Sequence, residues 1–275
     1  MKFIIGLLCT FSIVSFSWAR DISVGFLIYG DPLPKKALYV FDWLIVNPDS
    51  LHIDGLRYRA IKPKLIAYVS IGEVEPYREY FKDLKKEWIL GDNITWKSKI
   101  VDIRQDDYVE FLLKKVFSKL DQFDGFFLDT LDSYQNFLES PENRKPAEDN
   151  LVRLIKTLRS KYPDKIILIN RGFEIVERVS SEVNGLVAES LFYGLKLGEE
   201  IDYRKMNREE TEWLLGKLNH AKNLGLKVIV VDYVPPNNRK LQLETARKIY
   251  KLGFIPYVSD RYLRTLGVST YNLSR

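Results

Sequence analysis

The amino-acid sequence predicts an α/β fold of the (β/α)8 TIM-barrel class, formed by a single domain. Two observations lead to this prediction. Eight short apolar segments recur along a chain of 275 residues, close to the usual length of about 250 residues for such a barrel. Amphipathic helical patterns separate several of these segments, and eight strands that alternate with helices can close into a barrel.

The eight apolar segments are the expected strands. They are rich in Val, Ile, Leu and aromatic residues and do not alternate between apolar and polar positions, which is typical of strands buried on both faces. The expected strands are Ile22–Tyr29, Trp43–Val46, Leu65–Ser70, Gly125–Asp129, Lys165–Asn170, Gly185–Glu189, Lys227–Asp232 and Phe254–Val258.

Between the strands, apolar residues recur every three or four positions, as on one face of a helix. Such faces are Val109 to Leu120, Leu151 to Leu158, and Trp213 with Leu214 and Leu218. An open doubly wound sheet is the alternative fold, but no glycine fingerprint follows the first strand. The third connection, Ile71 to Asp107, is the longest, and loops of that length usually bind something.

Residues 1–19 are expected to be a signal peptide, which leaves 20–275 as the barrel domain. Lys2 precedes the apolar run Phe3–Phe16, and Ser17-Trp18-Ala19 places small residues at the −3 and −1 positions of a cleavage site. The run is short for a bilayer span, so we expect a secreted or periplasmic protein without stable membrane insertion. A retained N-terminal anchor is the alternative.

Composition excludes several kinds of chemistry. The single cysteine, Cys9, lies inside the signal segment, so the mature chain has no disulfide or thiol nucleophile. The two histidines, His52 and His220, are too few for a histidine metal triad. A nucleophile elbow and a phosphate loop are also absent from the sequence. We therefore expect no metal or cofactor. An oxygen-ligated calcium among the carboxylates is the alternative, although no EF-hand spacing is present. The net charge of +5 comes from interleaved charges without a basic tail, so no nucleic-acid partner is expected.

Polar residues gather at the carboxyl ends of the predicted strands, where barrel enzymes place their active sites. Single acids often cap the helix that follows a strand, but here carboxylates follow five strands that all end at one rim. Like charges so close together repel unless a substrate, proton or cation relieves them. The residues at this rim include Glu73, Asp129, Asp132, Asn170, Arg171, Glu189, Asp232 and Asp260.

Asp129 and Glu189 form the best candidate catalytic pair, because each is the last residue of a strongly apolar strand. Glycoside hydrolysis needs two carboxyl groups across a sugar ring, and apolar surroundings can raise the pKa of the one that acts as acid. Aromatic side chains near the strand ends can stack on sugar rings, and Arg171 can orient a carboxylate or form a surface ion pair. These aromatic residues are Tyr29, Trp96, Tyr134, Phe192, Tyr193 and Tyr233.

Five segments resemble glycoside hydrolase family 114, the endo-α-1,4-polygalactosaminidases, and the related hydrolase domain of Pel exopolysaccharide proteins. They are YVSIGEVEPYR (Tyr68–Arg78), FDGFFLDTLDSYQ (Phe123–Gln135), ILINRGFEI (Ile167–Ile175), GLVAESLFYG (Gly185–Gly194) and VIVVDYV (Val228–Val234).

This resemblance implies a barrel that cleaves α-1,4-linked, galactosamine-containing polysaccharide without a metal. It implies that Asp129 is the nucleophile and Glu189 the acid/base of a retaining mechanism, in an acidic cleft that suits cationic amino sugars. A carbohydrate-binding barrel without catalysis, using the same cleft, is the alternative function. The expected substrate-binding residues are Tyr29, Glu73, Asp132, Asn170, Arg171, Tyr193, Asp232 and Tyr233.

Overall fold

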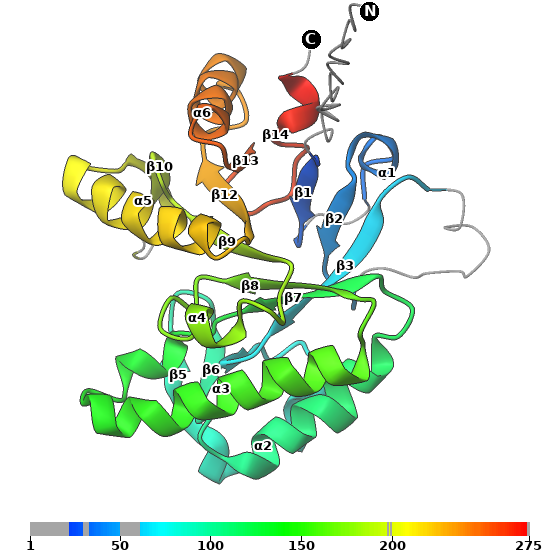
Figure 1. The fold of residues 1–275 in the computed structure, drawn as a ribbon, viewed down its shortest axis with the longest axis vertical. Coiled ribbons are helices and arrows are strands. Elements are labelled where there is room, and N and C mark those ends of the chain that lie inside the picture. The colour runs from blue at the N-terminus through cyan, green and yellow to red at the C-terminus, as the bar shows by residue number, and fades with distance from the viewer. Residues whose placement is uncertain (1–21, 30–32, 50–60, 197, 199, 274–275) are drawn as a thin grey trace, which may run out of the picture.

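A computed structural model of the protein describes residues 22–29, 33–49, 61–196, 198 and 200–273, and these form a barrel of parallel strands surrounded by helices (Figure 1). The predicted signal peptide lies outside the described residues. The eight barrel strands are β1 Val24–Leu27, β2 Trp43–Val46, β3 Lys64–Ser70, β7 Gly125–Asp129, β8 Ile166–Asn170, β9 Gly185–Glu189, β12 Lys227–Tyr233 and β13 Ile255–Ser259.

Neighbouring barrel strands pair in parallel and in chain order, β1-β2-β3-β7-β8-β9-β12-β13. This sequential order is that of a barrel and differs from the order of a doubly wound sheet. The predicted fold class is therefore confirmed, and every strand end lies within two residues of its predicted position.

The C-terminal segment helps to close the wall between the last and first strands. The hydroxyl of Tyr257 in β13 donates to the carbonyl of Phe26 in β1 at 2.8 Å, and the two rings lie 5.4 Å apart. A ninth strand, β14 (Val268–Ser269), runs antiparallel to β13. The Ser269 hydroxyl accepts a hydrogen bond from the amide of Val24 at 3.2 Å.

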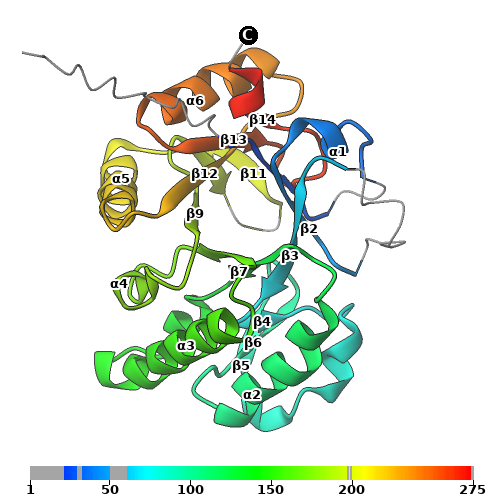
Figure 2. The same cartoon turned by 45° about the vertical axis from the view of Figure 1, so that its right-hand side comes forward.

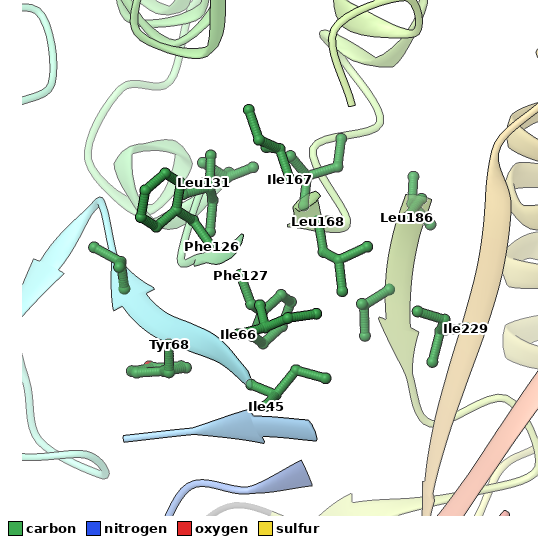
Figure 3. Close-up of a cluster of buried hydrophobic side chains, with 14 of the residues drawn as sticks. Ile45, Ile66, Tyr68, Phe126, Phe127, Leu131, Ile167, Leu168, Leu186 and Ile229 are labelled. Atoms are coloured by element: carbon green, nitrogen blue, oxygen red, sulfur yellow. The ribbon is translucent and has the colours of Figure 1, made fainter. Parts of the chain in front are cut away.

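The strand register decides which side chains face the barrel interior. Partners in register point to the same side, and so do residues two apart on one strand. Ile45 pairs with Ile66 across β2 and β3, and Figure 3 shows these side chains together with Phe127. Phe126 faces outward, where it packs against the rings of Phe117 and Tyr162 at 5.1 and 5.3 Å.

Helices cover the outside of the barrel, and α2 and α3 lie side by side in both views (Figures 1 and 2). The chain continues from α2 through a π-helical turn, Leu112–Val116, and a 3-10 turn, Phe117–Lys119. Trp213 does not share the buried face of its helix, because its side chain is 53% exposed. The α-helices are α1 Ala37–Val40, α2 Asp106–Phe111, α3 Pro141–Lys161, α4 Val176–Val179, α5 Arg208–Asn223 and α6 Arg239–Lys251.

Two insertions follow the carboxyl ends of barrel strands. The long connection after β3 forms a small antiparallel sheet in the order β4-β6-β5, and β9 is followed by the hairpin β10-β11. In the described part of the chain, no helix is long and apolar enough to cross a membrane. The remaining elements are β4 Glu73–Val74, β5 Ile89–Asn93, β6 Ser98–Val101, β10 Tyr193–Lys196, β11 Asp202–Lys205 and the 3-10 helices Glu79–Asp83, Lys86–Trp88, Ser133–Asn136 and Thr270–Asn272.

Replacing Tyr257 with Phe tests the closure of the barrel. The variant keeps the buried ring but leaves the Phe26 carbonyl without its hydroxyl donor. We expect the free energy of unfolding to fall by about 1–2 kcal/mol, measured by urea unfolding. Tyr39→Phe is the control, because that side chain is 65% exposed. Equal stability of the two variants would contradict the proposed role of this contact.

Candidate active site

A cavity of about 760 Å³ opens at the carboxyl ends of the barrel strands. This position is the one at which barrel enzymes place their active sites. Eight of the ten site residues expected from the sequence line it: Tyr29, Glu73, Asp129, Asp132, Asn170, Arg171, Glu189 and Tyr233.

Asp129 and Glu189 lie on either side of Asn170. The side-chain nitrogen of Asn170, Nδ2, donates to Asp129 Oδ1 at 2.7 Å and to Glu189 Oε1 at 2.9 Å. Because one nitrogen contacts both oxygens, these oxygens are at most about 5.6 Å apart. The three residues end β7, β8 and β9, which are adjacent in the barrel.

We call the two oxygens that Asn170 contacts, Asp129 Oδ1 and Glu189 Oε1, the inner oxygens, and the other oxygen of each carboxylate the outer oxygen. Each outer oxygen accepts a hydrogen bond from a tyrosine. Tyr68 donates to Asp129 Oδ2 at 2.9 Å, and Tyr233 donates to Glu189 Oε2 at 2.5 Å. Both tyrosine rings are buried. A continuous chain of hydrogen bonds therefore runs from Tyr68 through the carboxylate pair to Tyr233.

Burial and the nearby negative charge of Glu189 raise the pKa of Asp129 to about 6. Hydrogen bonds from Asn170, the Thr130 amide and Tyr68 act in the opposite direction, because they stabilise the anion. Asp129 is thus ionised above about pH 6 and protonated below it.

Each of the three strands that carry this group is followed by a residue in the left-handed region of backbone conformation. These residues are Thr130 (φ 60°), Arg171 (φ 53°) and Ser190 (φ 69°). Residues other than glycine rarely adopt this conformation, and strain of this kind clusters at functional sites. The backbone therefore turns sharply just after Asp129, Asn170 and Glu189.

Thr130 joins the ends of β3 and β7. Its hydroxyl oxygen accepts hydrogen bonds from the amides of Ile71 at 3.1 Å and Gly72 at 2.9 Å, and it lies 2.8 Å from the Ser70 hydroxyl. A side chain at Gly72 would collide with the Thr130 carbonyl. These contacts hold the turn that follows Asp129.

Asp232 lies beneath the cleft rather than along it. Its side chain is fully buried and accepts hydrogen bonds from the amides of Leu191, Phe192 and Tyr193 at 2.7, 2.9 and 3.0 Å. Burial raises the pKa of Asp232 to about 7. Asp232 therefore positions the loop that follows Glu189.

Glu73 connects the insertion after β3 to the loop after β7. It accepts hydrogen bonds from Ser98 at 2.5 Å, Ser133 at 2.6 Å and Asn93 at 3.2 Å. With most of its hydrogen-bonding capacity used, this buried side chain shapes the cleft wall.

A second polar cluster supports the same wall. The buried guanidinium of Arg78 donates to Glu75 at 3.1 Å, to Asn47 at 2.9 Å and to Asp49 at 2.9 Å. It also lies 5.6 Å from the centre of the Tyr68 ring. Because Tyr68 donates to Asp129, this ion-pair cluster supports a residue that contacts the carboxylate pair.

Sequence reasoning missed several residues of the cleft, of which Tyr68 is the clearest. Tyr68 pairs with Phe127, two residues before Asp129, and period-two spacing along the strand would have placed both side chains on the inner face. Glu75, Tyr77, Lys97, Arg204, Tyr262 and Arg264 also line the cavity and were not predicted.

Exposed aromatic rings border the cleft. Tyr29 is 37% exposed, Trp96 38% and Tyr77 55%, and all three line the cavity. Tyr193, by contrast, is half-buried in β10 and is not among the lining residues. Tyr134 is buried.

Charges of both signs line the cleft, whereas the resemblance implied an acidic one. Glu73, Glu75 and Asp132 follow β3 and β7. Arg171, Arg204 and Arg264 follow β8, β9 and β13, and Arg204 is paired with Glu210 at 2.7 Å. No group of three or more possible metal ligands was found among the described residues.

A family model described as glycoside-hydrolase family GH114 matches residues 22–274. The chain belongs to this family. It is a glycoside hydrolase, as the sequence predicted.

Solved structures agree with this assignment. The glycoside hydrolase domain of PelA from Pseudomonas aeruginosa is 28% identical, with a TM-score of 0.79 over 90% of this chain and 98% of that domain. Ega3 from Aspergillus fumigatus, in a complex with galactosamine, has a TM-score of 0.69 over 95% of this chain and 100% of that chain, at 14% identity. At that identity the second likeness concerns the fold alone.

Two relatives are uncharacterized proteins. One from Thermotoga maritima is 26% identical over 74% of this chain and 68% of its own length. One from Methanocaldococcus jannaschii is 29% identical over 74% of this chain and 63% of its own length. The match to this chain therefore spans less than two thirds of the latter protein.

Replacing Thr130 with Val tests the hydroxyl that joins β3 to β7. Both residues are β-branched, so the main change is loss of the hydroxyl. The Gly72 amide loses its acceptor and the Asp129 carbonyl loses a donor, whereas the Ile71 amide keeps the Asp129 carbonyl as acceptor at 3.0 Å. We expect the free energy of unfolding to fall by about 2 kcal/mol. Thr157→Val, on the exposed face of α3, is the matched control. A drop no larger than that of the control would show that the hydroxyl is dispensable.

Asp129→Asn should stabilise the protein at neutral pH. Because folding raises the pKa of Asp129 from 3.8 to about 6, the folded state binds more protons than the unfolded state between these values. Stability from this group therefore falls as pH rises from about 4 to 6. Above pH 6 the variant should be more stable by on the order of 1–2 kcal/mol, since the cleft solvates part of the charge.

Thermal unfolding at pH 4 and pH 7 measures this difference. The raised pKa of Asp232 affects both proteins alike and cancels in the comparison. A variant that is less stable than the wild type at pH 7 would contradict the expectation.

Proposed function

We propose that the chain cleaves α-1,4-linked, galactosamine-containing polysaccharide by a retaining mechanism with two carboxylates. The separation of Asp129 and Glu189 is the main support. Their inner oxygens are at most about 5.6 Å apart, whereas retaining enzymes have carboxyl groups about 5–5.5 Å apart and inverting enzymes about 6.5–9.5 Å.

Asp129 is the proposed nucleophile, because three neutral donors stabilise its anion: Tyr68, the Thr130 amide and Asn170. Its carboxylate attacks the anomeric carbon while the glycosidic C–O bond breaks. Glu189 gives its proton to the leaving oxygen in the same step. Glu189 then takes a proton from water, the water oxygen attacks the anomeric carbon, and Asp129 is released.

Asp132 is the proposed contact for an amino group of the substrate. Its carboxylate lines the cleft, and the interactions recorded for it are a hydrogen bond from its own backbone amide and the nearby charge of Arg171. Burial raises the pKa of Asp132, and the charge of Arg171 lowers it. A protonated amine would therefore meet an anion that still has free acceptor capacity.

Tyr29, Trp96 and Arg171 are proposed to bind the sugar chain. Tyr29 and Trp96 offer exposed ring faces, and Arg171 offers donors for hydroxyl groups beside the pair. For Tyr193 and Asp232 we propose positioning rather than contact with substrate, because neither lines the cavity. We also propose that the protein is exported, on the strength of residues 1–19.

A reducing-end assay on de-N-acetylated α-1,4-galactosaminoglycan tests the function. We expect the wild type to release reducing ends, and Asp129→Asn and Glu189→Gln each to lower the rate by at least about 1,000-fold. Asp106→Asn is the control, since this exposed residue lies on α2, away from the cleft.

Binding is measured in parallel by calorimetry on the same polymer. Binding by all variants without turnover by the wild type would support the alternative, a carbohydrate-binding barrel. Equal turnover by the wild type and both cleft variants would overturn the assignment of the catalytic pair.

A further inference from the structure

Asn170 occupies an unusual position between the two carboxylates. It ends β8, the strand between β7 and β9, and it pairs with Val187. Because Glu189 lies two residues after Val187, the side chains of Asn170 and Glu189 face the same side. β7 and β8 pair through Leu128 and Ile169, which places Asp129 beside Asn170 on that side.

The amide of Asn170 has only one favourable orientation. Its nitrogen faces both carboxylates, and turning the amide over would place its oxygen against two anions instead. The oxygen Oδ1 is buried and has no hydrogen-bond partner among the described residues. An unpaired buried acceptor costs about 1–3 kcal/mol, so the two carboxylates impose this orientation at the expense of stability.

Although Asn170 lines the cavity, its amide has little hydrogen-bonding capacity left for substrate. Both hydrogens of Nδ2 are directed at the carboxylates, and Oδ1 is shielded from solvent. A residue whose donors are all used and whose acceptor is covered is poorly placed to bind a sugar hydroxyl.

On the basis of the proposed function, we propose that Asn170 is a positioning residue that sets the spacing of the catalytic pair and keeps protons off its facing oxygens. An amide N–H can only donate, so Asp129 Oδ1 and Glu189 Oε1 remain acceptors. The reacting atoms are then the outer oxygens: Asp129 Oδ2 attacks the anomeric carbon, and Glu189 Oε2 carries the transferred proton.

This arrangement explains the two tyrosines as well. Tyr68 and Tyr233 donate to those same outer oxygens, and each hydroxyl also has lone pairs that can accept. The Tyr233 hydroxyl can therefore remain in contact with Glu189 Oε2 in both protonation states. The Asn170 amide has no such flexibility, because its nitrogen has no lone pair to offer.

Asn170→Leu tests the proposal, because it keeps the branched shape and removes both donors. Without these two donors, the negative charges of Asp129 and Glu189 repel each other more strongly, and the pKa of Asp129 rises. We expect kcat to fall about 100-fold, KM to change less than about threefold, and the acid limb of the pH profile of kcat/KM to move above its wild-type position near pH 6.

Asp132→Asn is the comparison variant, because it removes a proposed contact with the substrate. For that variant we expect a higher KM and an unmoved acid limb. If Asn170→Leu behaves in the same way, with a raised KM and an unchanged pH profile, Asn170 binds substrate and the proposal is wrong. Asn170→Ala repeats the measurement in case leucine disturbs folding.

Carbon-13 titration of the carboxyl groups gives a readout that does not need turnover. The Asp129 signal is assigned by its loss in Asp129→Asn, and we expect it to titrate at a higher pH in Asn170→Leu than in the wild type. An unchanged titration would overturn the proposal even if the protein cleaves the polymer. If no polymer is cleaved but the titration moves, the proposed function fails while the role of Asn170 in the pair stands.

Discussion

The repulsion between two half-buried carboxylates governs the arrangement of the whole site. The negative charge of either carboxylate, Asp129 or Glu189, disfavours ionisation of the other. Even so, no ion pair among the described residues involves either of them. Neutral donors stabilise them instead. A direct arginine partner would favour the anionic form of a carboxyl group, whereas the neutral donors leave the pKa of Asp129 raised.

The barrel supplies the geometry that this chemistry needs. Adjacent parallel strands lie about 4.8 Å apart, so two residues separated by one intervening strand are too far apart to touch and close enough to share a small ligand. Asn170 occupies that intervening strand end. Behind the pair, Asp232 gathers three amides of the loop after Glu189, and Thr130 fixes the turn after Asp129. The turns that follow Asp129 and Glu189 are therefore held by hydrogen bonds to backbone amides, and these bonds lie behind the carboxylate pair.

The sequence predicts the barrel, and the adjacency of Asp129 and Glu189 at its rim, because both leave local signals. Apolar runs mark the strands, and Asp129 and Glu189 are the last residues of two of them. Other features depend on contacts between distant segments. The cluster around Arg78 joins Asn47, Asp49 and Glu75 across two connections, and β14 is two residues long and recognisable only beside β13.

Roles within the rim were harder to predict than positions. A strand-end aspartate can face a ligand or the amides of a neighbouring loop, and Asp232 does the latter. Tyr68 resembles any core aromatic residue until the register places its hydroxyl against Asp129. Sequence spacing alone does not separate these cases, because the choice depends on which loop folds over which strand end.

The buried, unpaired oxygen of Asn170 and the raised pKa of Asp129 mean that the proposed catalytic group lowers the stability of the barrel that holds it. A single replacement that abolishes hydrolysis can leave the cleft intact and make the fold more robust.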